Sequence, residues 1–261
     1  MGARLGQHFL FDPSILKRIA AAAVAAPDDV VLEIGAGRGT LTVALAALAR
    51  RVVAVETDRA LAASLPARLA AAGAGRVEVI AGDALVVPWP RATVVCGNIP
   101  YAITTPLLER ALRPPAPRRI VFLVQAEVAE RLAAAPGTRA YGALTAGVRL
   151  VADVERLFAV PAGAFRPPPR VRSAVVRLTP RAAPLVRSEA EERRTRAVIQ
   201  AVFQRRRQQL GRTLREAWGV EREAAERLLG GLGLAPAVRG ETLAPEGFVA
   251  LARALGPRLA S

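Results

Sequence analysis

The chain has 261 residues, and 52% of them are hydrophobic, which is enough to bury one large core and a second, smaller one. This composition excludes disorder over most of the chain. The 37 Lys and Arg residues outnumber the 22 Asp and Glu residues and give a formal net charge of +15. Such an excess favours a polyanionic partner, with nucleic acid as the first candidate and an anionic membrane surface as the second.

The single cysteine, Cys96, excludes an internal disulfide and fits a reducing compartment. Because it lies in an apolar strand, we expect a buried thiol without a chemical role. The apolar run at 19–26 is too short to span a bilayer, and Asp12-Pro13 before it has the N-cap and first-turn residues of a helix. We therefore predict a soluble cytoplasmic protein with no membrane partner and no metal site.

Short apolar runs alternate with Ala- and Leu-rich helical stretches in the first half of the chain. The runs begin at residues 30, 51, 76, 93 and 119. Runs that are apolar throughout are typical of parallel strands covered by helices on both faces. After a helical segment near 141–151, two further strands at 154–160 and 174–178 are joined by a short Pro-rich connection. Such a connection favours an antiparallel pair at the sheet edge.

The chain changes character after a predicted linker at 179–188. Ser188 and Glu191 have the spacing of a capping box, and an apolar stripe follows at Val198, Val202, Leu210 and Leu214. Two shorter helices follow within 221–234 and 244–255. We therefore predict an α/β fold, with a doubly wound domain over residues 1–180 and a small helical domain over residues 181–261.

A glycine-rich turn follows the first of these strands. The string "EIGAGRG" places Gly35, Gly37 and Gly39 between a strand and a helix, where the backbone can approach a ligand closely. A dinucleotide fingerprint needs its third glycine at position 40, which is Thr40. The observed spacing is commoner in sites for S-adenosylmethionine, although a glycine turn without a ligand remains the alternative.

Acidic residues stand at the ends of the next two strands. Glu56 ends the second strand 19 residues after Gly37, where a carboxylate can accept hydrogen bonds from both ribose hydroxyls. Asp83 ends the third strand and suits a contact with the edge of adenine. Ligands of such sheets bind at the carboxyl ends of the strands, so the three strand ends predict one nucleoside-shaped site.

The fourth strand ends in "GNIPY". The exocyclic nitrogen of adenine is a poor nucleophile, because its lone pair is delocalised into the ring. The side chain of Asn98 and the carbonyl of Ile99 can localise that pair by accepting the two hydrogens, while Tyr101 stacks on the flipped base and Pro100 fixes the backbone. The alternative is an ordinary turn with a packed tyrosine.

The chain resembles the ribosomal RNA adenine dimethyltransferases over nearly its whole length. The resemblance rests on strings in this order: "GQHFL" at 6, "EIGAGRGTLT" at 33, "VETD" at 55, "GDAL" at 82, "GNIPYAITTPLL" at 97, "VQAEVAERL" at 124, "AYGAL" at 140, "FRPPPRVRSAVVRL" at 165, "FQRRRQQLGRTL" at 203 and "LGLAPAVRGETL" at 232. It implies a Rossmann-like, seven-stranded class I methyltransferase domain followed by a small helical domain. This agrees with the fold predicted from the apolar pattern.

The resemblance also implies two methyl transfers from S-adenosylmethionine to N6 of an adenosine, giving N6,N6-dimethyladenosine. In family terms, the cofactor would be held by His8, Leu10, Gly35, Gly37, Glu56, Asp83 and Asn98. Phe165 would lie against the other face of the target base and form a clamp with Tyr101. His8 stands where Asn is common, so its contact is expected through the backbone. We do not expect it to act as a base, because the N6 proton is acidic after transfer.

Two branches of the family share these motifs. The KsgA type acts on two adjacent adenosines in the loop of the 3′-terminal hairpin of 16S rRNA in the small ribosomal subunit, and the Erm type acts on one adenosine of 23S rRNA. "AYGAL", "FRPPPRVRSAVV" and "LGLAPAVRGETL" resemble the first. A non-catalytic RNA-binding assembly or transcription factor on the same fold is a further alternative. The charge disfavours a small-molecule methyltransferase, and the tail strings disfavour a DNA adenine methyltransferase.

Three consecutive basic residues, Arg205, Arg206 and Arg207, lie in the predicted first helix of the tail. Three consecutive helical positions span about 300°, so these side chains cannot all face one line of phosphates. A solvated basic turn is therefore the alternative to an RNA contact. Nothing in the sequence indicates an obligate dimer, and we expect a monomer that acts on the 30S subunit.

Overall fold

The computed structural model describes residues 8–100, 103–235 and 237–256, and its contacts divide the chain into two compact units. Unit 1 comprises residues 1–129 and 154–180, and unit 2 comprises residues 130–153 and 181–261. One division point lies at 180–181, where the sequence places a domain boundary. Residues 130–153 group with the helical tail instead of the sheet, and Tyr141 shows why: its buried hydroxyl donates to the carbonyl of Leu243 at 2.9 Å.

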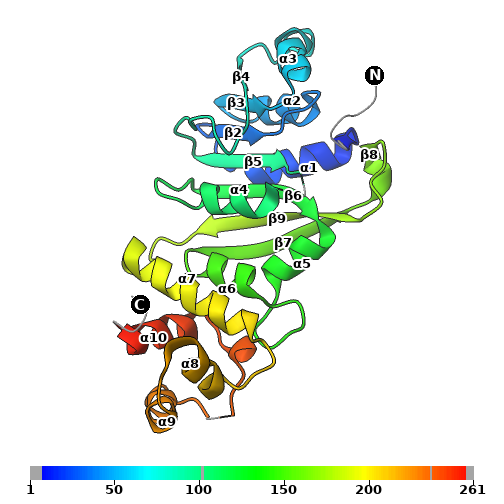
Figure 1. Ribbon diagram of the computed structural model, residues 1–261. Helices are drawn as coiled ribbons and strands as arrows, with labels where there is room; N and C mark the ends of the chain where they lie inside the picture. Colours follow the sequence, from blue (N-terminus) through cyan, green and yellow to red (C-terminus); the bar gives the residue numbers. More distant parts are fainter. Residues whose placement is uncertain (1–7, 101–102, 236, 257–261) are drawn as a thin grey trace. The chain divides into compact units, whose positions relative to one another are not determined.

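A seven-stranded sheet forms the centre of unit 1, in the order β4-β3-β2-β5-β6-β9-β7 (Figure 1). The strands are β2 (Val30–Ile34), β3 (Arg51–Glu56), β4 (Val77–Ala81), β5 (Val94–Asn98), β6 (Arg119–Gln125), β7 (Ala152–Val160) and β9 (Ser173–Pro180). Strands β4, β3, β2, β5 and β6 are parallel, and β9 is antiparallel to β6. The predicted seven-stranded, mostly parallel sheet is thus confirmed.

Helices cover both faces of this sheet, as predicted from its continuous apolar strands. They are α1 (Pro13–Ala23), α2 (Thr40–Ala46), α3 (Arg59–Ala71) and α4 (Thr104–Ala111), and α5 (Ala126–Ala133) runs from unit 1 into unit 2. Helices α1 and α2 pack on the face that carries Val31 and Cys96. Helix α4 borders the opposite face, beside Leu32 and Val95. Asp12 caps α1 as expected, because its carboxylate accepts from the first free backbone N–H groups.

The thiol of Cys96 has no exposed surface, and burial raises its pKa well above the ordinary value. A thiol that stays protonated is neither a nucleophile nor a metal ligand. The prediction of a buried thiol is therefore confirmed.

A second, two-stranded sheet was not predicted. Strand β1 (Phe9–Leu10) pairs antiparallel with β8 (Phe165–Arg166), which follows the short 3-10 helix η2 (Ala162–Ala164). Two-residue strands carry no readable period, so this pairing leaves no pattern in the sequence. It joins the start of the chain to the Pro-rich connection between β7 and β9, and so brings two predicted site segments together.

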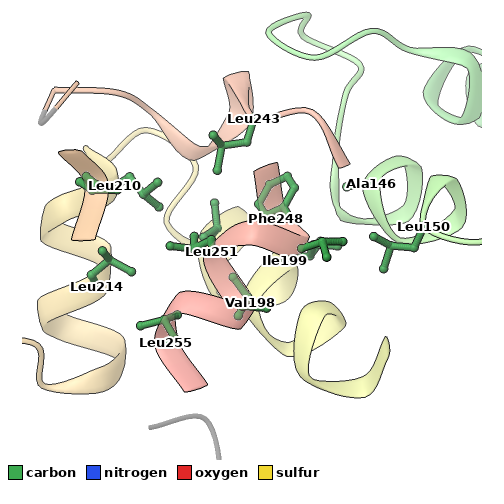
Figure 2. Close-up of a cluster of buried hydrophobic side chains, with 14 of the residues drawn as sticks. Ala146, Leu150, Val198, Ile199, Leu210, Leu214, Leu243, Phe248, Leu251 and Leu255 are labelled. Atoms are coloured by element: carbon green, nitrogen blue, oxygen red, sulfur yellow. The ribbon is translucent and has the colours of Figure 1, made fainter. Parts of the chain in front are cut away.

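Unit 2 is helical and has its own core (Figure 2). Its helices are α6 (Ala143–Arg149), α7 (Glu189–Gln204), α8 (Leu210–Trp218), α9 (Arg222–Gly231) and α10 (Pro245–Leu255), with the 3-10 helix η3 (Gly240–Thr242) before α10. Side chains from these helices, among them Ile199, Leu214 and Phe248, meet in the interior. In the described part of the chain no helix is both long and apolar enough to cross a bilayer.

The start of α7 fits the predicted capping box in part. The hydroxyl of Ser188 accepts from the backbone N–H of Glu191 at 3.2 Å, as expected. The Glu191 carboxylate, however, accepts from the backbone N–H of Arg187, one residue before the cap, and from Arg253 on α10. The side chain of Glu191 therefore caps the start of α7 and also links α7 to α10.

The end of α7 corrects one prediction. The helix stops at Gln204, so Arg205, Arg206 and Arg207 lie in a turn and not in a helix. The break lets the chain continue into a bridge in which the N–H of Leu210 donates to the carbonyl of Val238 at 2.7 Å. An apolar stripe that runs through both helices hides this break, because a turn can preserve the face on which the stripe lies.

Candidate active site

Polar groups gather where four neighbouring parallel strands of unit 1 end. Gly35 and Gly37 follow β2, Glu56 ends β3, Asp83 follows β4 and Asn98 ends β5. The register aligns these ends, since Ile34 pairs with both Val55 and Gly97, and Glu56 pairs with Ala81. The structure thus places the five predicted residues at one edge of the sheet, which we call the strand-end site.

The glycine turn at this edge has a backbone that other residues adopt only with strain. Gly35 has a φ of 74° and Gly37 a φ of 58°. The N–H groups of Gly35 and Ala36 both donate to the carbonyl of Val55, at 2.8 and 3.2 Å. A side chain at position 37 would also meet the ring of Phe9 at 3.2 Å. The turn is therefore tied to β3, and a side chain at position 37 would be strained by its backbone and crowded by Phe9.

Glu56 is only 3% exposed, and both of its carboxylate oxygens are held by the backbone. Oε2 accepts from the N–H of Gly37 at 2.7 Å, and Oε1 accepts from the N–H of Asp58 at 2.9 Å. Each carboxylate oxygen has a second lone pair, so both can accept a further hydrogen bond. Asp83 is exposed, and its Oδ1 accepts from Leu85 at 2.8 Å. Two fixed acceptors thus point from neighbouring strand ends.

Asn98 is held by the N-terminal segment. Its Nδ2 donates to the carbonyl of His8 at 3.0 Å. The next residue, Ile99, is buried and its N–H donates to the carbonyl of Leu123 on β6 at 3.0 Å. The end of β5 is therefore fixed on both sides, while Tyr101 lies outside the described residues.

The segment from His8 to Leu10 contacts several parts of the site. The carbonyl of Leu10 accepts from the Thr40 hydroxyl at 2.7 Å, and Nδ1 of His8 lies 2.8 Å from the carbonyl of Pro167. A carbonyl only accepts, so Nδ1 must carry the proton in this contact. In the sequence Thr40 stands only where a dinucleotide fingerprint would have its third glycine, and no sequence signal indicates its role in holding this segment.

Phe165 occupies a different environment from the one expected of a free aromatic wall. Its side chain is only 3% exposed and packs in the core with Leu10 and Ala164. A base that contacts this ring would have to displace the groups that cover it. The structure thus brings Phe165 next to Leu10 without presenting its face to solvent.

Glu33 is a buried carboxyl that our sequence reasoning passed over. It lies in β2 and is 1% exposed, and its Oε2 has no hydrogen-bond partner in the described part of the chain. Burial, with a smaller contribution from the charge of Glu56, raises its pKa to about 7. A glutamate inside the otherwise apolar run "VVLEIG" was the available signal.

An open hollow of about 880 Å³ lies on unit 2. We call this open pocket the Arg hollow. It is lined by five arginines and four other residues: Arg139, Arg205, Arg206, Arg207, Arg239, Gly137, Gln204, Gln208 and Glu241. The turn after α7 places all three predicted arginines at one rim. Because these residues lie in a turn, their side chains are not spread around a helix as predicted.

The arginines of the hollow are not equivalent. Arg206 forms an ion pair with Glu241 at 2.5 Å and donates to the carbonyl of Thr138 at 2.9 Å. Arg205 lies 3.4 Å from Glu216. Within the described ranges, Arg207 forms no ion pair and its side chain is exposed. Arg206 is therefore part of the fold of unit 2, and Arg207 has a charge free for a partner.

Neither region resembles a metal centre. Among the residues that the structure describes, no group of three or more His, Cys, Asp or Glu side chains is placed to hold a metal ion.

Comparison with known proteins gives a consistent result. The family model for ribosomal RNA adenine dimethylase matches residues 2–238. Ribosomal RNA small subunit methyltransferase A of Thermobifida fusca is 42% identical over 255 residues, which cover 95% of this chain and 88% of that protein.

Solved structures agree over the whole length. A dimethyladenosine transferase from Plasmodium falciparum superposes with a TM-score of 0.85 at 28% identity, covering 96% of this chain and 98% of that one. The 23S rRNA methyltransferase ErmE has a TM-score of 0.75 at 30% identity, covering 97% and 100%. With its family model and its sequence relatives in agreement, the chain belongs to the ribosomal RNA adenine dimethylase family.

Proposed function

We propose that the chain transfers methyl groups from S-adenosylmethionine to N6 of two adjacent adenosines in the loop of the 3′-terminal hairpin of 16S rRNA. One observation carries this proposal: a glycine turn, two acidic side chains and an Asn meet at the ends of four adjacent parallel strands. In a member of this family, that set provides both a nucleoside pocket and an acceptor for an exocyclic amine.

The residues present fit S-adenosylmethionine, which supplies a methyl group on a positively charged sulfur. We propose that the free lone pairs of Glu56 accept from the two ribose hydroxyls, since its carboxylate is already fixed by the N–H of Gly37. The exposed carboxylate of Asp83 suits the amino edge of adenine. The turn at Gly35 leaves room for the methionine part, with His8 and Leu10 lining the pocket.

At the end of β5, Asn98 acts on the target base. Its Oδ1 and the carbonyl of Ile99 accept the two N6 hydrogens and localise the nitrogen lone pair. S-adenosylmethionine would supply the methyl group and keep the carbon–sulfur electron pair, while N6, held by Asn98 and the carbonyl of Ile99, would bond to the methyl carbon and release one proton to water. A second round on the same nitrogen gives the dimethylated base. Tyr101 and Phe165 are proposed to hold the base between them once the Phe165 ring is uncovered.

We assign RNA recognition to unit 2, residues 181–261 together with 130–153. Support comes from the Arg hollow, where Arg207 is exposed and unpaired among the described side chains. When an arginine without an internal partner pairs with a phosphate, counterions are released from the RNA. This release strengthens binding, and the gain becomes smaller as the salt concentration rises. We further propose that the protein acts as a monomer on the 30S subunit in the cytoplasm.

The alternative substrate is 23S rRNA, because ErmE is structurally similar to this chain. A direct comparison separates the two. Labelled S-adenosylmethionine is incubated with the protein and either under-methylated 30S particles or naked 23S rRNA. We expect label in 16S rRNA alone. Label in 23S rRNA alone would favour the large-subunit activity, and cofactor binding without label in either RNA would favour a non-catalytic assembly factor.

A further inference from the structure

We propose that the backbone carbonyl of His8 positions the side chain of Asn98 and thereby requires Asn, and not Asp, at this place in the site. The inference deepens the proposed function, because it concerns the orientation of the group that accepts from the target amine. It does not depend on the identity of the RNA.

The orientation follows from the chemistry of the contact. The carbonyl of His8 can only accept, so the atom of Asn98 that lies 3.0 Å from it must be the amide nitrogen. The amide oxygen is then directed to the other side of the group. The contact therefore selects one of the two flipped orientations of the amide, the one in which Oδ1 is free to accept.

The segment that carries the His8 carbonyl is itself held from several sides. The N–H of Phe11 donates to the carbonyl of Ala164 at 3.0 Å, and the Thr40 hydroxyl donates to the carbonyl of Leu10 at 2.7 Å. The His8 ring also contacts the carbonyl of Pro167. Segments from the start of α2, from β8 and from β5 thus converge on residues 8–11, and Thr40 acts as a positioning residue for Asn98.

Aspartate at position 98 would be a better acceptor for the amine, but it could not donate a hydrogen bond to the carbonyl of His8. Its two carboxylate oxygens carry no hydrogen, so one of them would face the His8 carbonyl oxygen without a donor between them. If only an acceptor were needed at this place, Asp would serve. The structure therefore makes Asn98→Asp a discriminating substitution.

Asn98 is the only Asn and His8 the only His in the chain, so the contact can be measured directly. Protein made with ¹³C-carbonyl histidine and ¹⁵Nδ2 asparagine contains one such labelled pair. Rotational-echo double-resonance NMR measures the carbon–nitrogen distance, which is expected to be about 4 Å for a hydrogen bond of ordinary length. A distance beyond about 6 Å would overturn the proposal whatever the activity of the protein.

The activity arm uses paired variants at pH 8 on under-methylated 30S particles. Asn98→Asp should lower kcat by about 100-fold, as for loss of an oriented catalytic hydrogen bond, with a smaller change in KM for the cofactor. Activity of Asn98→Asp within threefold of wild type would contradict the requirement for Asn. A wild-type protein that shows the short distance but methylates no RNA would instead refute the proposed function and leave the contact intact.

Thr40 provides the test of the anchor. Thr40→Val should lower kcat by about tenfold and lengthen the measured distance, whereas Thr40→Ser keeps the hydroxyl and should restore both. Thr42→Val is the matched control, since Thr42 is buried on the same helix and its hydroxyl makes no hydrogen bond to residues 8–11 in the described structure. Equal loss in Thr40→Val and Thr40→Ser would show that the hydroxyl does not position the segment.

Discussion

The strand-end site of unit 1 and the Arg hollow of unit 2 are both polar, but Glu56 in the first and Arg207 in the second are held in opposite ways. Glu56 is 3% exposed, and both of its oxygens are bonded to backbone N–H groups. Arg207 is exposed on a turn and has no ion pair within the described ranges. A reaction needs acceptors fixed to a fraction of an ångström, whereas a flexible polyanion can be met by mobile charges. The contrast supports our proposal that unit 1 carries out the chemistry and that unit 2 recognises the charge of the RNA.

The largest expected effect is at the reacting end of the strand-end site. Asn98→Ala removes the side-chain acceptor for the target amine and should lower the rate of transfer by about 100- to 1,000-fold. Its fold should stay intact, because the removed side chain is anchored by one hydrogen bond to a carbonyl that water can satisfy. Rates are measured on under-methylated 30S particles, with circular dichroism as the check on folding. A fully active variant would refute the assignment of chemistry to this site.

The next effect concerns the cofactor side of the same site. Glu56→Ala removes two charged acceptors for the ribose and frees the N–H of Gly37, so the affinity for S-adenosylmethionine should fall by about 10- to 100-fold. Calorimetric titration measures it. Glu78→Ala is the control, because Glu78 lies on the neighbouring strand β4 in an exposed ion pair with Arg51. Equal losses in the two variants would show that the effect is one of general charge.

A smaller effect is the pH dependence of stability, which should have opposite signs for two buried carboxyls, Glu33 in unit 1 and Glu191 in unit 2. The pKa of Glu33 is raised to about 7 by burial, so the folded state keeps its proton between pH 4.5 and 7 while the unfolded state loses it. Stability of unit 1 should therefore fall as pH rises through this window and then level off. Glu33→Gln should flatten this slope and add about 2 kcal/mol at pH 8.

The measurement is urea unfolding in a Trp218→Phe background, where Trp89 alone reports on unit 1. Glu191 in unit 2 should behave in the opposite way. Its pKa is lowered by the hydrogen bond from Arg253, so the stability that it contributes is present above pH 4.5 and is lost as pH falls below this value. Within the Trp218→Phe background, an unchanged slope in Glu33→Gln would contradict the raised pKa of Glu33.

The smallest effects distinguish two neighbouring arginines of the hollow. Arg207→Ala should weaken RNA binding and reduce the slope of log affinity against log salt by about 1, the value for one phosphate contact. Arg206→Ala should instead lower the stability of unit 2 by about 1 kcal/mol, because Arg206 bonds to Glu241 and to the carbonyl of Thr138. An unchanged salt slope in Arg207→Ala would show that Arg207 does not contact RNA phosphates.

The residues at the strand-end site could be predicted because strand ends of a parallel sheet meet at one edge, whatever the loops do. Gly35, Glu56, Asp83 and Asn98 needed only the strand positions to be placed together. The pairing of β1 with β8 could not be predicted, since it depends on two-residue strands far apart in the chain. The burial of Phe165 follows from that pairing and was hidden for the same reason.

The helical unit shows the same limit. Periodicity identified its helices, but it does not report where one helix breaks if the apolar face continues beyond the break. The turn at Arg205–Arg207 is fixed by a bridge to Val238, and residues 130–153 join this unit through the bond from Tyr141 to Leu243. Both depend on contacts between distant segments, which a local pattern does not contain.

The most direct test of the central claim is the product itself. Under-methylated 30S particles are incubated with S-adenosylmethionine and either wild-type protein or Asn98→Ala, and the modified nucleosides of 16S rRNA are mapped by mass spectrometry. We predict N6,N6-dimethyladenosine at two adjacent positions in the loop of the 3′-terminal hairpin with wild-type protein, and none with the variant. Methylation of another atom or another base, or equal product from both proteins, would contradict the assignment of adenine N6 chemistry to the strand-end site.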